Sequence, residues 1–319
     1  MSVFSRILFA VKDTDPRRPH GLAKVIALAK AGDAALDLFH AVSAPLYLPE
    51  GADRMTIGDL KRDTLELHRL RLEKLAAIAR RRGLSVTCTV VWDHPPHEAI
   101  VRHATETGAG LIVAQSHEGG GKFWHMRFTD WELIRTSPIP VLLMRSAQPY
   151  RRPAILAAVD PVHAHAKPHD LDGSVLAGGR ALAALLRGKL HVVHASYPSL
   201  LGLAVETPFA AEDLRAHDLR EFEKLMARAD VTARRGHWVE GDPADVIPGV
   251  AGKIHAGIVV MGAISRSGLK RLFIGNTAER TVGRLSCDVL IVKSSDFRPR
   301  VARRRNDALV LGASAVMPG

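Results

Sequence analysis

Pro96-His97-Glu98-Ala99-Ile100 recurs as Pro243-Ala244-Asp245-Val246-Ile247, so the chain carries two copies of one pattern, shifted by 147 positions. Two further pairs of motifs keep this shift: Ala109-Gly110-Leu111-Ile112-Val113 with Ala256-Gly257-Ile258-Val259-Val260, and Thr129-Asp130-Trp131-Glu132 with Asn276-Thr277-Ala278-Glu279. A constant shift across three motifs indicates duplicated domains of roughly 150 residues, which suits a chain of 319 residues. Solenoid repeats are much shorter, roughly 20–50 residues.

Each half alternates short apolar runs with longer amphipathic stretches. Runs such as Ile7–Val11 and Ile258–Met261 are typical of strands buried on both faces of a sheet. The expected strands are 7–11, 36–42, 86–92, 111–114 and 141–144 in the first half, and 155–159, 190–194, a run near 231–239, 258–261 and 289–292 in the second. The expected helices cover 58–82, 96–107, a segment opening at 129, 173–187, 210–229, 243–254 and 276–284. This alternation predicts parallel βαβ units, hence an α/β fold in which each half is a five-stranded doubly wound sheet.

The repeat predicts two domains, 1–147 and 153–297, joined by a proline-containing linker at 146–153 and followed by a basic tail at 298–319. Cys88 and Cys287 form no CxxC motif and lie in apolar runs, which is typical of buried thiols in a reducing compartment. No apolar stretch approaches the roughly 18 residues of a membrane span, and no signal peptide is evident. A cytoplasmic location is therefore expected.

The formal net charge of +11 can attract nucleic acid, anionic lipid or phosphorylated ligands. Aromatic residues make up only 5% of the chain and do not alternate with the basic ones, so stacking platforms for single strands are lacking. Nucleic-acid binding is therefore disfavoured.

Ligands of open α/β sheets bind beyond the carboxyl ends of the strands, where three segments of the second half are predicted to converge. They are Asp160 after the first strand, Ala195 after the second, and the loop from Gly262 to Thr277 after the fourth. Glycines in this loop let the backbone approach a ligand closely, and the loop ends at a helix N-terminus, which favours an anion. The predicted site residues are Asp160, Ala195, Gly262, Ser265, Gly268, Gly275, Asn276 and Thr277.

The equivalent loop of the first half differs at key positions. The shift of 147 pairs Gly262 with Gln115, Ser265 with Glu118 and Gly275 with Phe128. An added carboxylate repels phosphate, and a bulky aromatic side chain blocks close approach of the backbone. At the counterpart of Asp160 the first half has Lys12, with Asp13 one residue later. The helix cap, Thr129 with Glu132, is kept, so the first half is predicted to be a structural partner with a degenerate site.

The second-half loop resembles a known signature. Gly262, Ser265 and then Gly275-Asn276 resemble the universal stress protein signature G-x2-G-x9-G-[ST]. The tandem arrangement, with Val90-Val91-Trp92 and Phe128-Thr129-Asp130-Trp131, resembles the two-domain E-type bacterial members over residues 4–297. This sequence departs from the signature at Ser265, where the family has glycine, and at Asn276, where it has serine or threonine.

The resemblance implies a parallel sheet in 3-2-1-4-5 order and dimer-like association of the two domains. It also implies, for many members, a bound ATP: the acid after strand one and the backbone after strand two hold ribose and adenine, and the glycine loop holds the phosphates. Here these positions match Asp160, Ala195, Gly262, Gly275 and Asn276.

Other candidate sites are weaker. His163, His165 and His169 with Asp160, Asp170 and Asp172 suggest a metal cluster, but their spacing matches no standard zinc site, and a solvated loop is the preferred interpretation. Gly119-Gly120-Gly121-Lys122 lacks the first glycine and the final hydroxyl of a P-loop. His40 and His194 end the second predicted strand of each half, and this recurrence favours structural histidines over catalytic ones.

These observations predict a stress-response protein, not a dedicated enzyme, whose second domain senses ATP, with Mg²⁺, or a related phosphorylated molecule. The first alternative is a nucleotide-independent stress protein that binds another ligand or protein partners, and the second is a slow ATP hydrolase. The two halves are expected to form a pseudo-dimer within the chain, and a homodimer of the whole chain stays open.

Overall fold

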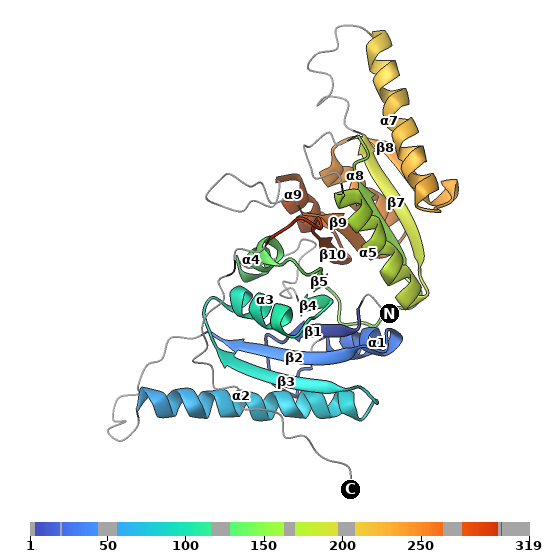
Figure 1. Cartoon of the computed structure of the whole chain (residues 1–319). Coiled ribbons are helices and arrows are strands. Elements are labelled where there is room, and N and C mark those ends of the chain that lie inside the picture. The colour runs from blue at the N-terminus through green and yellow to red at the C-terminus, as the bar shows by residue number, and fades with distance from the viewer. Residues whose placement is uncertain are drawn as a thin grey trace. The chain divides into compact units, whose positions relative to one another are not determined.

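The computed structural model describes residues 4–19, 21–43, 56–115, 128–162, 170–196, 208–263, 276–298 and 301; for 128, 208–211, 276 and 277 it describes the backbone alone. The chain divides into two compact units (Figure 1). The first comprises Met1–Gln115, Ala147–Pro149 and Arg300–Gly319, and the second comprises Ser116–Ser146 and Tyr150–Pro299. The last helix and strand of the first repeat therefore belong to the second unit, while the repeat boundaries at 147 and 153 stay a prediction.

The first unit is a parallel sheet in the order β3-β2-β1-β4. Its strands are β1 (Arg6–Ala10), β2 (Ala35–Val42), β3 (Val86–Trp92) and β4 (Leu111–Gln115), and its described helices are α1 (Leu22–Ala31), α2 (Ile57–Arg80) and α3 (Pro96–Glu106). Successive residues of β2 face different helices: the Phe39 ring stacks on His103 of α3, and the His40 ring stacks on His68 of α2. The sheet is thus covered on both faces, which explains its continuous apolar strands.

The second unit is a sheet in the order β5-β10-β9-β6-β7-β8. Its strands are β5 (Val141–Met144), β6 (Ala154–Val159), β7 (Lys189–Ser196), β8 (Gly236–Glu240), β9 (Ala256–Gly262) and β10 (Asp288–Val292). Its described helices are α4 (Phe128–Thr136), α5 (Leu171–Leu186), α7 (Pro208–Arg228), the short 3₁₀ helix η2 (Ala233–Arg235), α8 (Pro243–Lys253) and α9 (Asn276–Arg284). The five strands of the second repeat are parallel and follow the order 3-2-1-4-5, as predicted. The last strand of the first repeat, β5, pairs antiparallel with β10.

The α/β, doubly wound fold is confirmed, with three local differences. Helix α1 was not anticipated, because Leu22–Ala31 is apolar around most of its circumference and shows no clear amphipathic stripe. Strand β8 begins at Gly236 and not near 231, because Ala233–Arg235 form a 3₁₀ turn. Helix α4 begins at Phe128, one residue earlier than expected. Within the described ranges, no helix has the length and apolarity needed to cross a bilayer.

A buried carboxylate holds the segment that follows β5. Asp288, at the start of β10, is only 1% exposed. One of its oxygens accepts the backbone N–H of Arg145 at 2.9 Å, and the other accepts the hydroxyl of Tyr150. The Arg145 guanidinium in turn donates to the Leu285 carbonyl at 2.7 Å. Asp288 therefore fixes the course of the chain between the two repeats.

Replacing Asp288 by alanine removes the acceptor for a backbone amide and for a hydroxyl. We expect Asp288→Ala to lower the free energy of unfolding by about 3 kcal/mol, measured by urea unfolding. The control is Asp213→Ala on exposed α7 surface, which should change stability by less than about 0.5 kcal/mol. Equal stability of the two variants would show that Asp288 is not an anchor.

Candidate functional site

Three predicted site residues lie at one edge of the second unit. Val159 is paired with His194, and Ala158 with Met261, so β6, β7 and β9 end in neighbouring rows. Asp160 directly follows β6, Ala195 lies near the end of β7, and Gly262 is the last residue of β9. The parallel register thus brings Asp160, Ala195 and Gly262 together at the carboxyl edge.

Asp160 is held through its backbone. Its N–H donates to the carboxylate of Asp172, in the first turn of α5, at 3.1 Å to Oδ1 and 3.3 Å to Oδ2. Asp170 accepts from the backbone and hydroxyl of Ser295. The carboxylates of Asp170 and Asp172 therefore serve as acceptors within the fold. His163, His165 and His169 lie outside the described residues, and the described part of the chain holds no group of three metal-ligating side chains.

Gly262 has a packing role that the sequence did not reveal. A Cβ at this position would lie 2.6–2.8 Å from the side chain of Leu171. Leu171 is the first residue of α5 and is 4% exposed, so it fills the space above the glycine. The close approach that glycine permits here is made by a leucine side chain of the protein itself.

A buried network lies beneath Ala195. His194 donates through Nδ1 to the Val159 carbonyl at 3.1 Å, and its Nε2 lies 2.7 Å from Oδ1 of Asp218 on α7. Trp238 of β8 donates to the other oxygen of Asp218 at 3.2 Å. Burial alone would raise the pKa of Asp218, but the hydrogen bonds from His194, Ser196 and Trp238 hold that pKa below its usual value. The network joins β6, β7, β8 and α7.

The equivalent histidine of the first unit makes the same backbone contact. His40 donates through Nδ1 to the Val11 carbonyl at 2.7 Å. Its ring stacks on His68 at a centroid distance of 4.6 Å. At the corresponding place the second unit has an acid, Asp218. Burial lowers the pKa of His40, with a further lowering from His68. Both recurrent histidines are buried and bonded, as the structural interpretation predicts.

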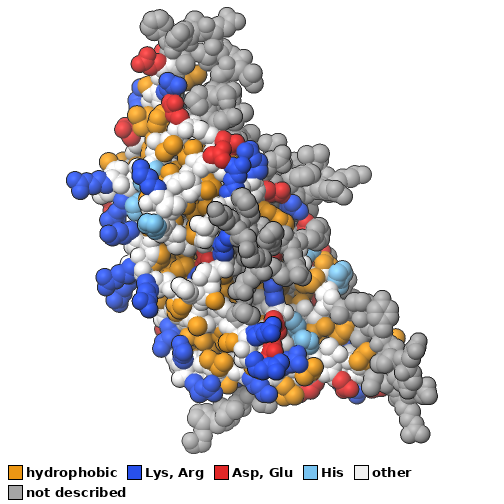
Figure 2. All heavy atoms as spheres, turned by 180° about the vertical axis from the view of Figure 1, so that it is seen from behind, with side chains coloured by type: hydrophobic (Ala, Val, Ile, Leu, Met, Phe, Trp, Pro, Cys, Tyr) orange, Lys and Arg blue, Asp and Glu red, His pale blue; other side chains and the backbone are white. Residues whose placement is uncertain are grey.

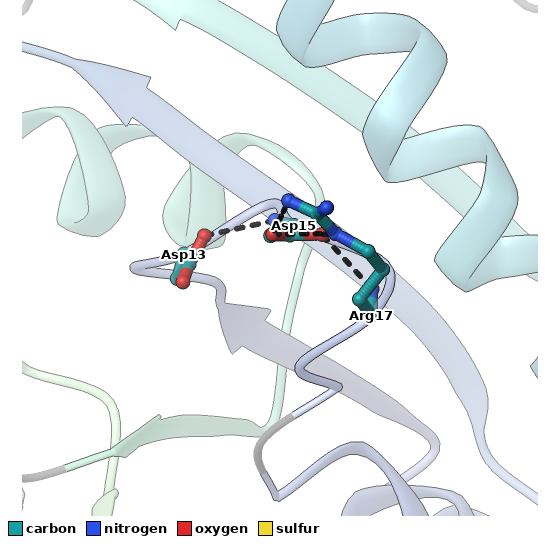
Figure 3. A network of polar contacts seen from close by, with 3 residues as sticks. All are labelled: Asp13, Asp15 and Arg17. Carbon is teal, nitrogen blue, oxygen red and sulfur yellow. Dashed lines mark hydrogen bonds and ion pairs between the residues drawn. The ribbon is translucent and has the colours of Figure 1, made fainter.

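The loop after β1, which corresponds to the loop of Asp160, is closed on itself (Figure 3). Asp13 accepts the backbone N–H of Asp15 at 2.8 Å. Asp15 accepts the backbone N–H of Arg17 at 3.0 Å and its guanidinium at 2.8 Å, and these bonds hold the pKa of Asp15 below its usual range. The acidic side chains of this loop are thus used by the loop itself.

A buried cation at the same edge was missed by sequence reasoning. Lys293 directly follows β10 and is 9% exposed, and Val292 before it is paired with Gly262. Its ammonium lies 4.8 Å from the centre of the Phe297 ring, and no hydrogen bond to it is found among the residues that the structure describes. Burial, and secondarily Arg135, lower its pKa to about 8. The signal in the sequence is a basic residue directly after an apolar strand, Arg145 in the first repeat and Lys293 in the second.

Arg135 of α4 connects the two recurrent glutamates. It donates to Glu132 at 2.6 Å and to Glu279 of α9 at 2.7 Å. These glutamates were predicted to cap their own helices, and the pairing with Arg135 was not anticipated. Because Glu132 and Glu279 are both paired with Arg135, their carboxylates do little to offset the charge of Lys293.

The remaining predicted residues are only partly visible. Helix α9 begins at Asn276, as expected, but the side chains of Asn276 and Thr277 lie outside the described part. Ser265, Gly268 and Gly275 lie outside the described residues altogether. Their role in a site stays a prediction.

Comparison with known proteins finds relatives that match nearly the whole chain. The Universal stress protein E homolog of Haemophilus influenzae is 28% identical over 295 residues, which cover 90% of this chain and 92% of that protein. A solved structure of a functionally unknown protein from Pseudomonas aeruginosa PAO1 is 25% identical with a TM-score of 0.68, covering 92% of this chain and 94% of that chain. The structure of a universal stress protein from Archaeoglobus fulgidus DSM 4304 is 15% identical with a TM-score of 0.61, covering 91% and 98%, and shows a shared fold.

The model of the Universal stress protein family matches residues 4–145 and 154–293, one match in each repeat. The chain therefore belongs to the universal stress protein family, as a tandem two-domain member of the E type.

Proposed function

We propose that this chain is a stress-response protein whose second repeat binds ATP, with Mg²⁺, or a related phosphorylated molecule at the carboxyl edge of its sheet. The observation that carries the proposal is Lys293, a buried ammonium that stands at the same edge as Asp160 and Gly262. A buried cation without a carboxylate partner is costly, and a phosphate would offset that cost. Strongly perturbed ionisable groups in such places are candidates for function.

The other features of the edge suit the same ligand. The acid Asp160 can accept ribose hydroxyls, the backbone at Ala195 can meet a base, and the N-terminus of α9 favours an anion. The antiparallel pairing of β5 with β10 supports an expected pseudo-dimer of the two repeats. The alternative is a nucleotide-independent protein that binds another ligand or protein partners. Titration with ATP–Mg²⁺ discriminates between these two functions.

Gly275→Phe copies the residue that the first repeat has at the equivalent position, Phe128. We expect calorimetric titration with ATP–Mg²⁺ to give saturable binding to the unaltered chain and at least about tenfold weaker binding to Gly275→Phe. Gly262 is a poorer target, because a side chain there would collide with Leu171 and disturb the fold itself.

The matched control is Gly121→Phe, which puts the same side chain into the loop of the first repeat and should leave binding unchanged. Absence of heat with the unaltered chain, up to about millimolar ATP, removes ATP as the ligand. Multiple-turnover phosphate release that Asp160→Asn abolishes would instead establish the slow hydrolase.

Lys293→Met removes the buried ammonium. Because the folded pKa of about 8 lies below the ordinary 10.5, the unfolded chain binds the extra proton between these values. The penalty on stability is therefore complete below pH 8 and fades as the pH rises towards 10.5. We expect Lys293→Met to raise the free energy of unfolding near neutral pH by roughly 3 kcal/mol, and to weaken ATP–Mg²⁺ binding about tenfold.

The two effects are measured by urea unfolding across this pH range and by calorimetry. Lys61→Met, on exposed α2 surface, is the control and should change neither. A Lys293→Met variant that gains stability but binds ATP–Mg²⁺ unchanged would contradict the role of Lys293 in binding.

A further inference from the structure

A second group of basic side chains lies at the opposite, amino end of the second-repeat sheet. Lys189 and His191 stand at the start of β7, and Arg235 and His237 flank the start of β8. Val192 is paired with Gly236, and Arg235, directly before Gly236, lies close enough to His191 to act on its charge. Lys253, in the last turn of α8, completes what we call the amino-edge basic cluster. On the face drawn in Figure 2, histidine side chains lie beside lysine and arginine side chains.

The strand residues of this cluster share one face of the sheet. Side chains alternate along a strand, and His194 points to Asp218 of α7. Lys189 and His191 therefore point to the other face, which α8 covers. Helix α8 runs back from the carboxyl edge, so its last turn, with Lys253, returns to the amino end of the strands.

The two histidines are in direct contact. His191 Nδ1 lies 3.1 Å from His237 Nε2, and the rings are stacked at 5.4 Å. One proton lies between the two nitrogens, because one ring must donate and the other accept. Both rings are half-buried, whereas Lys189, Arg235 and Lys253 are exposed.

Among the residues that the structure describes, the charged groups that shift the pKa values of the two rings are all basic. Burial lowers the pKa of His191, with further lowering from His237, Arg235 and Lys189. Burial and then Lys253 lower the pKa of His237. The acid of α8, Asp245, lies in its first turn at the other end of the helix and pairs with Arg284.

The two repeats differ at the position of His191. The third residue of β2 is Asp37, and the third residue of β7 is His191. Asp37 is 1% exposed and its Oδ2 lies 2.8 Å from Nε2 of His103 on α3, so an acid is paired with a base there. In the second repeat an imidazole has replaced the acid, and cations surround it. A structural role alone explains the pair in the first repeat, but it gives no reason for the cluster of like charges in the second.

We propose that the amino-edge basic cluster is a binding site for a phosphate-bearing anion, separate from the nucleotide site at the carboxyl edge. Arginine, lysine and imidazole N–H groups are the usual donors to phosphate. The alternative occupant, a metal ion held by the two imidazoles, is disfavoured because three cations surround it and no carboxylate completes a ligand set within the described residues. Bound phosphate favours the uptake of one proton by the histidine pair, because one ring nitrogen must stay an acceptor for the shared hydrogen bond, so phosphate binding is coupled to protonation of the pair.

The test is a titration of the full chain with inorganic phosphate at low salt, followed by NMR of the histidine ring nitrogens. The signals are assigned with His191→Gln and His237→Gln. We expect phosphate to raise the pKa for proton uptake by the histidine pair, observed at both rings, by about one unit, and this response should saturate. The double variant Arg235→Gln/Lys253→Gln should weaken this binding at least about tenfold.

The matched control, Arg81→Gln/Arg82→Gln, removes two exposed charges from the end of α2 and should leave the titration unchanged. Absence of a response at these rings, or an equal response in both double variants, overturns the proposal. So does stoichiometric Zn²⁺ binding at the rings without any response to phosphate. A phosphoserine peptide, compared with its unphosphorylated copy, separates the sources: tighter binding than inorganic phosphate indicates a modified protein, and weaker binding indicates a small molecule.

Discussion

The parallel register that joins β6 to β7 and β9 is the constraint on which the candidate site depends. With Val159 beside His194 and Ala158 beside Met261, the strands end together, and residues distant in sequence meet at one edge. The register is itself held from within: His194 binds the Val159 carbonyl and Asp218, so a side-chain bridge closes the strands just below the edge. A one-residue slip would turn every buried side chain to the other face, which makes this register hard to change.

Much of the fold could be predicted from the sequence because the physics was local. Apolar runs marked the strands, helical spacing marked α2, and the shift of 147 supplied an independent copy of each pattern. The candidate site was predictable only in outline. The contact of Gly262 with Leu171, and the burial of Lys293, depend on packing between segments far apart in the chain, which no local pattern encodes. The pairing of β5 with β10 was invisible for the same reason.

The two repeats diverge most where side chains meet from different elements. The recurrent histidine contacts the same backbone carbonyl in both, but its outer partner is His68 in one and Asp218 in the other. The third residue of the second strand is an acid paired with a base in the first repeat, and a histidine among cations in the second. Backbone-directed contacts were thus retained, since the fold requires them. Contacts between side chains were free to change, and the second repeat gained positive charge at the amino end of its sheet.

The charge of Lys293 is informative because burial makes it expensive. Lys293 is 9% exposed, and its ammonium is disfavoured strongly enough to lower its pKa to about 8. Methionine would fill the same space without that penalty, and groups that break local rules are expected at functional or strained sites. The glycines of the neighbouring loop support no comparable argument, because Gly262 is already required by Leu171. The buried lysine is therefore stronger support for an anionic ligand at this edge than the glycine signature that first drew attention to it.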